Sequence, residues 1–258
     1  MPVATERRFK GTMSEDYHLL RLAMPHFEEL QQRIGEAVAR FAGAGPSGRI
    51  HILDLGCGSG ITSEMILASG KDILLTSLDN EEKMTRQATE NLSEDIREDR
   101  CRVVLQDALD YSRDQRDGTF DIVASVLTLH NMHHAYRSLL HREIFRVLKP
   151  GGLFINGDKY VEGDEERFKK LQVALGRFFD AFVPLGKVHL LKDWVLHNVA
   201  DQAPDRVMKA ADAVQELREI GFKSVEIQGR YNMEAVLVAK KPDVEGGRVE
   251  GYADERAE

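Results

Sequence analysis

The sequence predicts an α/β protein with a Rossmann-like, mainly parallel sheet of seven strands and helices on both faces. Short apolar segments alternate with helical segments between residues 49 and 157, and a glycine-rich turn joins the first strand to the first helix. Alternating strands and helices indicate βαβ units, and right-handed crossovers place helices on both faces of the sheet. Two more strand-like segments near the C-terminus complete the sheet.

The expected strands are short, mostly apolar runs. They cover residues 49–55, 72–78, 102–106, 120–126, 153–157, 223–229 and 234–239. Helical segments are expected at 61–69, 81–92 and 136–148, and Pro150 follows the end of the third. A short turn around Tyr231 joins the last two strands, which favours an antiparallel edge on a parallel sheet.

Further helical segments flank and interrupt this pattern. Apolar residues recur at three- and four-residue steps from Ser14 to Phe41, and Pro25 is expected to divide this stretch into two helices. About 60 residues separate the fifth strand from the sixth, whereas a simple crossover needs only about a dozen. They are helical in pattern, with helices expected around 171–185, 190–199 and 206–220. We expect the excess to form a lid over the site.

These features divide the chain into three parts. An N-terminal helical cap covers residues 1–47, and an α/β domain covers residues 48–240 with a helical insertion at about 160–220. The tail at 241–258 is rich in glycine and glutamate, a composition typical of disordered segments. The apolar lid helices offer a face through which two copies of the chain could form a homodimer.

Composition excludes several classes of protein. The net charge is −8 over 258 residues, which argues against a dedicated nucleic-acid binder with a basic face. No apolar run approaches the ~20 residues of a membrane span, and the polar N-terminus lacks the apolar region of a signal peptide. The two cysteines, Cys57 and Cys101, form neither a disulfide framework nor a zinc-binding pattern. We therefore expect a cytoplasmic protein with reduced thiols.

The turn after the first strand carries the strongest functional signal. Residues 54–60 read Asp-Leu-Gly-Cys-Gly-Ser-Gly. Glycine permits a tight turn and close approach of a ligand, and the following helix offers free N–H groups. The dinucleotide pattern G-x-G-x-x-G would need a third glycine at position 61, which is Ile61. The pattern is therefore D-x-G-x-G-x-G, unlike that of a typical NAD site.

This spacing resembles motif I of the class I S-adenosylmethionine-dependent methyltransferases. Matches to four further family motifs follow in the family's order: Asp79, Asp107, the pair Phe120-Asp121, and the turn Pro150-Gly151-Gly152. The resemblance covers roughly residues 48–160. It implies that residues 48–240 bind S-adenosylmethionine as methyl donor. The acidic net charge and the insertion favour a small-molecule acceptor.

The resemblance also assigns residues to the cofactor. Asp79 would bind the ribose hydroxyls and Asp107 the adenine amine, although each could instead cap the helix that follows it. The glycines Gly56, Gly58 and Gly60 would shape the turn. Further cofactor contacts are expected from Asp54, Asn80, Ala108 and Leu127. Asp54 is expected to order the turn or to approach the ligand's amino group through water.

The segment after the fourth strand supplies a candidate catalytic residue. It contains His130, His133 and His134, and histidine can exchange protons near neutral pH. We expect His130 to contact the acceptor or act as a base, whereas the other two would cap the next helix or face solvent. No carboxylate or cysteine pattern completes a metal site in the sequence, so no metal is expected. Residues 158–160 end the fifth strand at the same rim.

One branch of the family shares more features with the chain. Residues 16–20, 178–184 and 231–236 resemble the carboxy-S-adenosylmethionine synthases that serve tRNA wobble-uridine modification, and imply that Tyr17 reaches over the cofactor. That branch holds the extra carboxylate with an arginine, where our alignment places Asp193. Facing carboxylates would repel each other, so ordinary methyl transfer is favoured. Such a synthase, or a non-catalytic cofactor-binding partner, remains the alternative.

Overall fold

A computed structural model describes residues 8–9, 11–44 and 48–243. The expected disordered tail beyond residue 243 lies outside the described residues, as do residues 1–7, 10 and 45–47 of the expected N-terminal cap. Within the described ranges, no helix is both long and apolar enough to cross a membrane.

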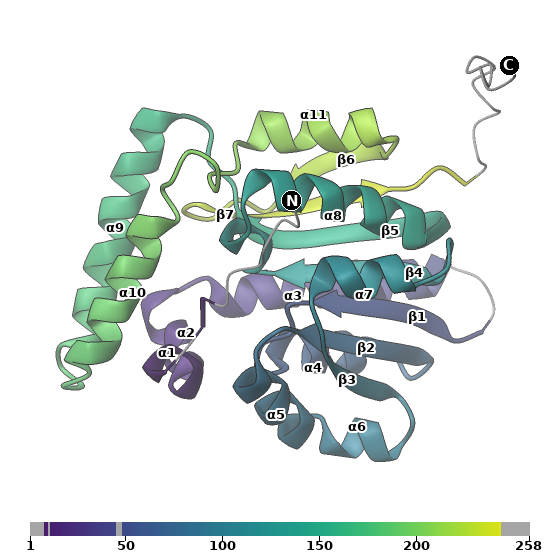
Figure 1. The fold of residues 1–258 in the computed structure, drawn as a ribbon, viewed down its shortest axis with the longest axis horizontal. Helices are drawn as coiled ribbons and strands as arrows, with labels where there is room; N and C mark the ends of the chain where they lie inside the picture. Colours follow the sequence, from purple (N-terminus) through teal and green to yellow (C-terminus); the bar gives the residue numbers. More distant parts are fainter. Residues whose placement is uncertain (1–7, 10, 45–47, 244–258) are drawn as a thin grey trace, which may run out of the picture.

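A seven-stranded mixed sheet forms the centre of the molecule, in the order β3-β2-β1-β4-β5-β7-β6 (Figure 1). Strands β1 to β5 are parallel, whereas β7 runs antiparallel to both of its neighbours. The strands are β1 (Ile50–Leu55), β2 (Ile73–Asp79), β3 (Cys101–Leu105), β4 (Phe120–Val126), β5 (Leu148–Lys159), β6 (Lys223–Gln228) and β7 (Glu234–Lys240). The predicted fold class is therefore confirmed, including the antiparallel edge.

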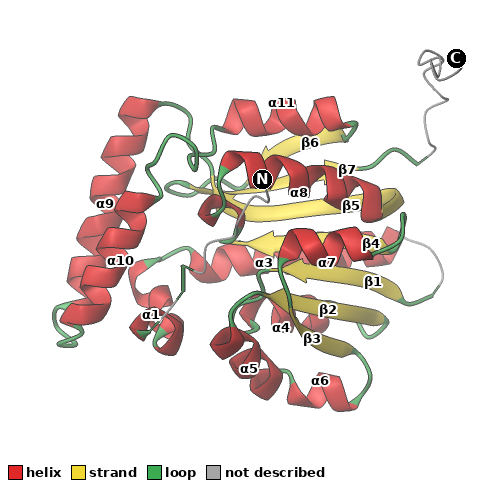
Figure 2. Cartoon of the chain, in the orientation of Figure 1, coloured by secondary structure: helices red, strands yellow, loops and turns green. Residues whose placement is uncertain are grey.

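Helices cover both faces of the sheet (Figure 2). One face packs on α3 (Phe27–Ala44), α4 (Ile61–Ala68) and α5 (Glu82–Asn91), and the other on α7 (Ala108–Asp114), α8 (His134–Val147) and α11 (Ala210–Ile220). Two neighbouring residues of β1 show why the sequences of the strands are continuously apolar. Ile52 belongs to the core on the first face and Leu53 to the core on the second, as expected for a parallel sheet buried on both sides.

The inserted helices stand at the carboxyl ends of the central strands (Figure 1). They are α9 (Asp164–Phe182) and α10 (Val188–Ala200), which pack against α1 (Thr12–Glu15) and α2 (Leu20–Ala23) of the N-terminal region. A 3₁₀ turn, η1 (Tyr17–Leu19), joins α1 to α2. Helix α2 ends before Pro25 and α3 begins after it, as expected, but the stretch before Pro25 consists of α1, η1 and α2 and is not the single helix that was predicted. The two regions together enclose one end of the sheet.

Several predicted boundaries are wrong. Strand β5 is longer than expected because Leu148 continues the pairing with β4 before the Pro150 turn. Helix α11 begins at Ala210 and not near residue 206, since Met208 and Ala210 bond with the backbone of Val161 instead. Helices α6 (Ser93–Arg97) and α7 were not predicted. Their short, polar sequences carry little apolar periodicity.

Candidate active site

A first cavity opens where β1 to β4 end, with about 880 Å³ of empty volume including its mouth. The carboxyl ends of the strands in an open α/β sheet are where such proteins bind ligands. Eight of the residues predicted to be cofactor-binding or catalytic line its wall: Tyr17, Gly56, Gly58, Asp79, Asn80, Asp107, Ala108 and Leu127. Asp54, Gly60 and His130 do not line it.

The glycine turn forms the floor of this cavity. Gly56, Gly58 and Gly60 all have positive φ angles, of 72°, 55° and 96°, a region that side chains disfavour. The N–H groups of Gly56 and Cys57 donate to the Leu78 carbonyl at 2.8 and 2.9 Å. A Cβ at Gly56 would lie 2.3 Å from the Thr128 side chain. Glycine at this position is thus required both by the backbone angle and by the close approach of β4's end.

Replacing Gly56 by alanine is expected to displace Thr128 and the turn, and to weaken S-adenosylmethionine binding at least about tenfold, because such strain costs about 1–3 kcal/mol. Titration calorimetry with S-adenosylhomocysteine measures the affinity. Gly176→Ala on α9 is the matched control, since a Cβ there meets nothing within 4 Å. If G56A bound as tightly as the parent protein, the floor of the binding site would lie elsewhere.

Asp79 joins the glycine turn to the next helix. Its Oδ2 accepts the Gly58 N–H at 3.0 Å, and its Oδ1 accepts the Glu81 N–H at 2.9 Å. Burial raises the pKa of this carboxyl, against the lowering effect of these backbone donors. Asp79 thus bonds with the residue that precedes α5 and also lines the cavity, while its binding to the ribose stays a prediction.

Asp107 offers an unused acceptor in the same wall. Its Oδ1 caps α7 by accepting the N–H groups of Leu109 and Asp110 at 2.9 and 3.2 Å, and accepts the Tyr136 hydroxyl at 2.7 Å. Its Oδ2 is buried with no hydrogen-bond partner among the described residues. An unpaired buried acceptor is costly, and an amine donor such as that of adenine would satisfy it. The wall therefore fits the expected cofactor.

Asp54 lies beneath the turn and not in the cavity wall. It is fully buried and accepts the Ser63 hydroxyl of α4 at 2.7 Å. Desolvation raises its pKa to about 7. This placement favours the interpretation that Asp54 orders the turn. Gly60 also supports the glycine turn, from its position at the N-terminal end of α4.

A second cavity, with about 620 Å³ of empty volume, adjoins the first beneath the lid helices. Phe9, Tyr17 and Leu127 line both cavities. The rest of its wall combines apolar side chains with a few polar ones: Leu20, Ala23, Met24, Pro25, His26, His130, Lys159, Ala174, Arg177, Phe178, Trp194, His197, Asn198, Asn232 and Glu234. Such a mixture is typical of small-molecule sites.

Tyr17 stands at the junction of the cavities. Its ring meets Phe9 edge-on at 5.9 Å and lies 6.3 Å from Trp194. Burial, followed by the charges of Asp79 and Asp158, raises its pKa well above the ordinary value. Tyr17 therefore remains a neutral hydroxyl at physiological pH, suited to packing and hydrogen bonding and not to acting as an anion.

His130 forms a buried pair with Asp158, which ends β5. Its Nδ1 lies 2.6 Å from Asp158 Oδ1, while Oδ2 accepts the N–H groups of Leu129 and His130. Burial alone would raise the pKa of Asp158, but the charge and hydrogen bonds of His130 outweigh it and hold the pKa below its usual value. The ionised carboxylate accepts from Nδ1–H, so in the neutral ring the lone pair is on Nε2.

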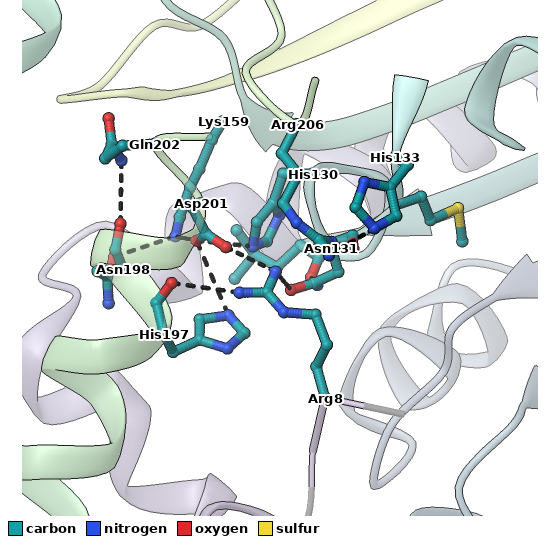
Figure 3. A network of polar contacts seen from close by, with 12 residues as sticks. Arg8, His130, Asn131, His133, Lys159, His197, Asn198, Asp201, Gln202 and Arg206 are labelled. Carbon is teal, nitrogen blue, oxygen red and sulfur yellow. Dashed lines mark hydrogen bonds and ion pairs between the residues drawn. The ribbon is translucent and has the colours of Figure 1, made fainter. Parts of the chain in front are cut away.

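Asp201, at the end of α10, ties the lid to this pair (Figure 3). It binds Lys159 Nζ and Arg8 Nη1, each at 2.7 Å, and lies 3.5 Å from His130 Nε2 and 3.8 Å from His197 Nε2. The lysine's charge, with the other cations, holds the pKa of Asp201 far below its usual value despite burial. Burial lowers the pKa of His197, so this ring is neutral.

The expectation of no metal rested on the sequence, which shows no ligand pattern around His130. His130, His197 and Asp201 bring possible ligand atoms within 4.8 Å of one another, although no sequence spacing showed it. Arg8 and Lys159 already pair with this aspartate. The cluster is thus part of an ion-pair network, and we propose no metal there.

Two other expectations also need correction. His133 does not cap α8 with its side chain but pairs with Asp205 at 2.5 Å. Asp193 accepts the Thr12 hydroxyl at 2.6 Å and lines neither cavity. It therefore does not face a cofactor carboxylate, as the alignment suggested. His134 is exposed, as expected.

Comparison with known proteins identifies similar sequences. Residues 52–152 match a family described as a methyltransferase domain. A demethylmenaquinone methyltransferase of Lactococcus lactis is 33% identical over 188 residues, or 69% of this chain and 68% of that protein. A Leptospira interrogans protein of the same name is 36% identical over 112 residues, which span 43% of this chain and only 44% of the relative. The carboxy-S-adenosyl-L-methionine synthase of Shewanella amazonensis is 27% identical over 55% of this chain and 56% of that protein.

A solved structure shares the fold over nearly the whole chain. It is a putative S-adenosyl-L-methionine-dependent methyltransferase from Methanococcus maripaludis, with a TM-score of 0.61 over 94% of this chain and 98% of that one. The two are 18% identical, so this likeness concerns the fold alone.

Proposed function

The chain belongs to the S-adenosylmethionine-dependent methyltransferases, and we propose that it methylates a small molecule held in the second cavity. The observation that carries this proposal is that Phe9, Tyr17 and Leu127 line both cavities. A donor in the first cavity and an acceptor in the second would meet at these residues. Methyl transfer by in-line displacement needs this kind of alignment, which can lower a barrier by about 7–11 kcal/mol.

The first cavity would hold the methyl donor. Asp79 would bind the ribose hydroxyls, Asp107 Oδ2 would accept the adenine amine, and Asn80, Ala108 and Leu127 would enclose the base and its neighbours. Gly56 and Gly58 would allow close contact with the backbone, supported by Asp54 and Gly60 from below. S-adenosylmethionine supplies a methyl group that is already activated.

His130 would act as the base for the acceptor. Asp158 fixes the ring so that Nε2 carries the lone pair, and His130 lines the second cavity. As the acceptor's oxygen or carbon forms its bond to the methyl group, the acidic proton on that atom would pass to Nε2. Tyr17 would close over the junction and keep water away from the transfer.

The wall of the second cavity supports a small, partly apolar acceptor. Leu20, Met24 and Phe178 contribute apolar surface, and His130 and Asn198 contribute polar groups. The relatives named as demethylmenaquinone methyltransferases also support a small-molecule acceptor. The net charge of −8 makes a nucleic-acid substrate a poor fit.

Two further proposals concern the protein's setting. Exposed apolar residues gather on the lid helices and their connection, and would support a homodimer: Phe168, Val173, Phe179, Val183, Leu185, Val188, Leu196 and Val199. Cys57 and Cys101 are buried free thiols, which supports a reducing, cytoplasmic compartment.

A broad acceptor panel tests the proposed activity. Phenols, hydroquinones, thiols and carbon acids are each incubated with protein and S-adenosylmethionine, and S-adenosylhomocysteine is measured. We expect at least one acceptor to form it at a rate proportional to protein concentration. If no compound raised formation above the background without acceptor, the small-molecule proposal would fail, and a non-catalytic cofactor-binding role would replace it.

A further inference from the structure

Two residues in the wall of the second cavity carry hydrogen-bond donors that have no partner among the described residues. Trp194 is 3% exposed, and its indole Nε1 has no partner among the described residues. Trp194 comes from α10 and lines the wall of the acceptor cavity. A buried donor left unpaired costs free energy, and the cost disappears when a ligand supplies an acceptor atom.

Arg177 adds a charged donor to the same wall. Arg8 and Lys159, the other arginine or lysine side chains of the two walls, both pair with Asp201. No hydrogen bond or ion pair is formed by the half-buried Arg177 guanidinium within the described ranges. The acidic residue of this wall, Glu234, lies on β7 and forms no ion pair with Arg177 there. The guanidinium therefore remains available to a ligand.

Aromatic rings surround Trp194 in this wall. The rings of Phe178 and Trp194 stack at 5.6 Å, and Phe9 and Tyr17 both lie near Trp194, at 6.2 and 6.3 Å. A guanidinium binds carboxylate or phosphate oxygens through two parallel hydrogen bonds. The cavity thus combines an aromatic lining with recognition of an oxyanion.

We propose that the methyl acceptor carries an oxyanion, a carboxylate or a phosphate, which Arg177 binds with help from the Trp194 N–H. This inference rests on the proposed function and narrows its acceptor class. Because Arg177 is on α9 and Trp194 is on α10, the anion would join the two lid helices. In this proposal Arg177 selects the acceptor by binding its anionic group and takes no part in the reaction. The proton is transferred at His130, in the same cavity.

The single tryptophan of the chain gives a direct readout. Trp194 is that residue, so its fluorescence reports occupancy of the second cavity. Phenylacetate, phenyl phosphate and the neutral phenylacetamide are titrated into protein saturated with S-adenosylhomocysteine. At least one anion is expected to bind at least about tenfold more tightly than the amide, the effect of one charged hydrogen-bonded contact. Equal affinities, or no fluorescence response to any anion, would overturn the proposal.

Two variants locate the effect. Arg177→Gln is expected to remove the preference for anions, whereas Lys169→Gln should retain it. Lys169 is exposed on the same helix and pairs with Glu165, so the control makes the same change of charge outside the cavity. A preference retained in R177Q would exclude Arg177 as the anion site. Circular dichroism and affinity for S-adenosylhomocysteine show whether each variant is folded.

The anion could also belong to a modified cofactor. Mass spectrometry of ligand extracted from purified protein distinguishes the two sources. Unmodified S-adenosylmethionine or S-adenosylhomocysteine agrees with an anionic acceptor, whereas a carboxylated S-adenosylmethionine would place the carboxylate on the donor and overturn this assignment. Failure of the proposed function appears separately, as absence of methyl transfer in the acceptor panel, repeated with carboxylate- and phosphate-bearing members, despite an intact preference for anions.

Discussion

Replacing His130 by glutamine is expected to lower the turnover number for methyl transfer by about 10²–10⁴-fold, the usual contribution of a positioned general base. The affinity for S-adenosylmethionine should be unchanged, because His130 lines the second cavity and not the first. Initial rates with the acceptor found in the panel give the turnover number, and calorimetry gives the cofactor affinity.

Asp158→Asn is also expected to lower the turnover number for methyl transfer. An asparagine amide oriented toward the ring would donate to Nδ1 and place the ring's hydrogen on Nε2, the atom that must accept the proton. His189→Gln serves as the control, since His189 is exposed on α10. A turnover number preserved in H130Q would mean that the acceptor reacts without this base, and the role of the Asp158 pair would then be structural.

Replacing Asp79 by alanine is expected to weaken cofactor binding at least about tenfold, or about 1.4 kcal/mol. The change removes the carboxylate proposed for the ribose and also the acceptor of the Gly58 and Glu81 N–H groups. Calorimetry with S-adenosylhomocysteine measures the loss.

Two variants separate the causes of that loss. Asp79→Asn retains an acceptor for one backbone N–H, so an intermediate affinity is expected. Glu82→Ala should bind as the parent protein does, because Glu82 pairs with Arg86 on the exposed surface of α5. Unchanged affinity in D79A would show that the assignment of the end of β2 to the ribose is wrong.

Local sequence patterns predicted the sheet well because each central strand is buried on both faces. The run 120–126, for example, coincides with β4, whose residues are all buried. The same logic failed for α7, where the sequence Ala-Leu-Asp-Tyr-Ser-Arg-Asp offers little apolar periodicity and the start depends on the Asp107 cap. It also failed for the start of α11, which is set by pairing with Val161 far earlier in the chain.

The first cavity was more predictable than the second for a related reason. Asp79 is the last residue of β2, and Asp107 comes two residues after the end of β3, so that local position alone brings them to one edge of the sheet. The network around Asp201 joins His197, four residues earlier, to Arg8 and His130, which are far away in sequence. Only the pair of His197 and Asp201 has a spacing that the sequence could have shown.

The lid helix α10 shows how a sequence alignment can assign the wrong residue to a site. Neighbouring residues on a helix point about 100° apart because one turn holds about 3.6 residues. Trp194 therefore lines the second cavity, whereas Asp193 beside it bonds with Thr12. An error of one position in the alignment changes which side chain is expected at the site.

A crystal structure with bound S-adenosylhomocysteine tests the central claim, that donor and acceptor meet where the two cavities join. The account predicts the adenine amine at Asp107 Oδ2, the ribose at Asp79, and the sulfur beside Tyr17 and Leu127, open toward His130. A sulfur atom directed away from the second cavity, or a nucleoside bound outside the first cavity, would contradict it.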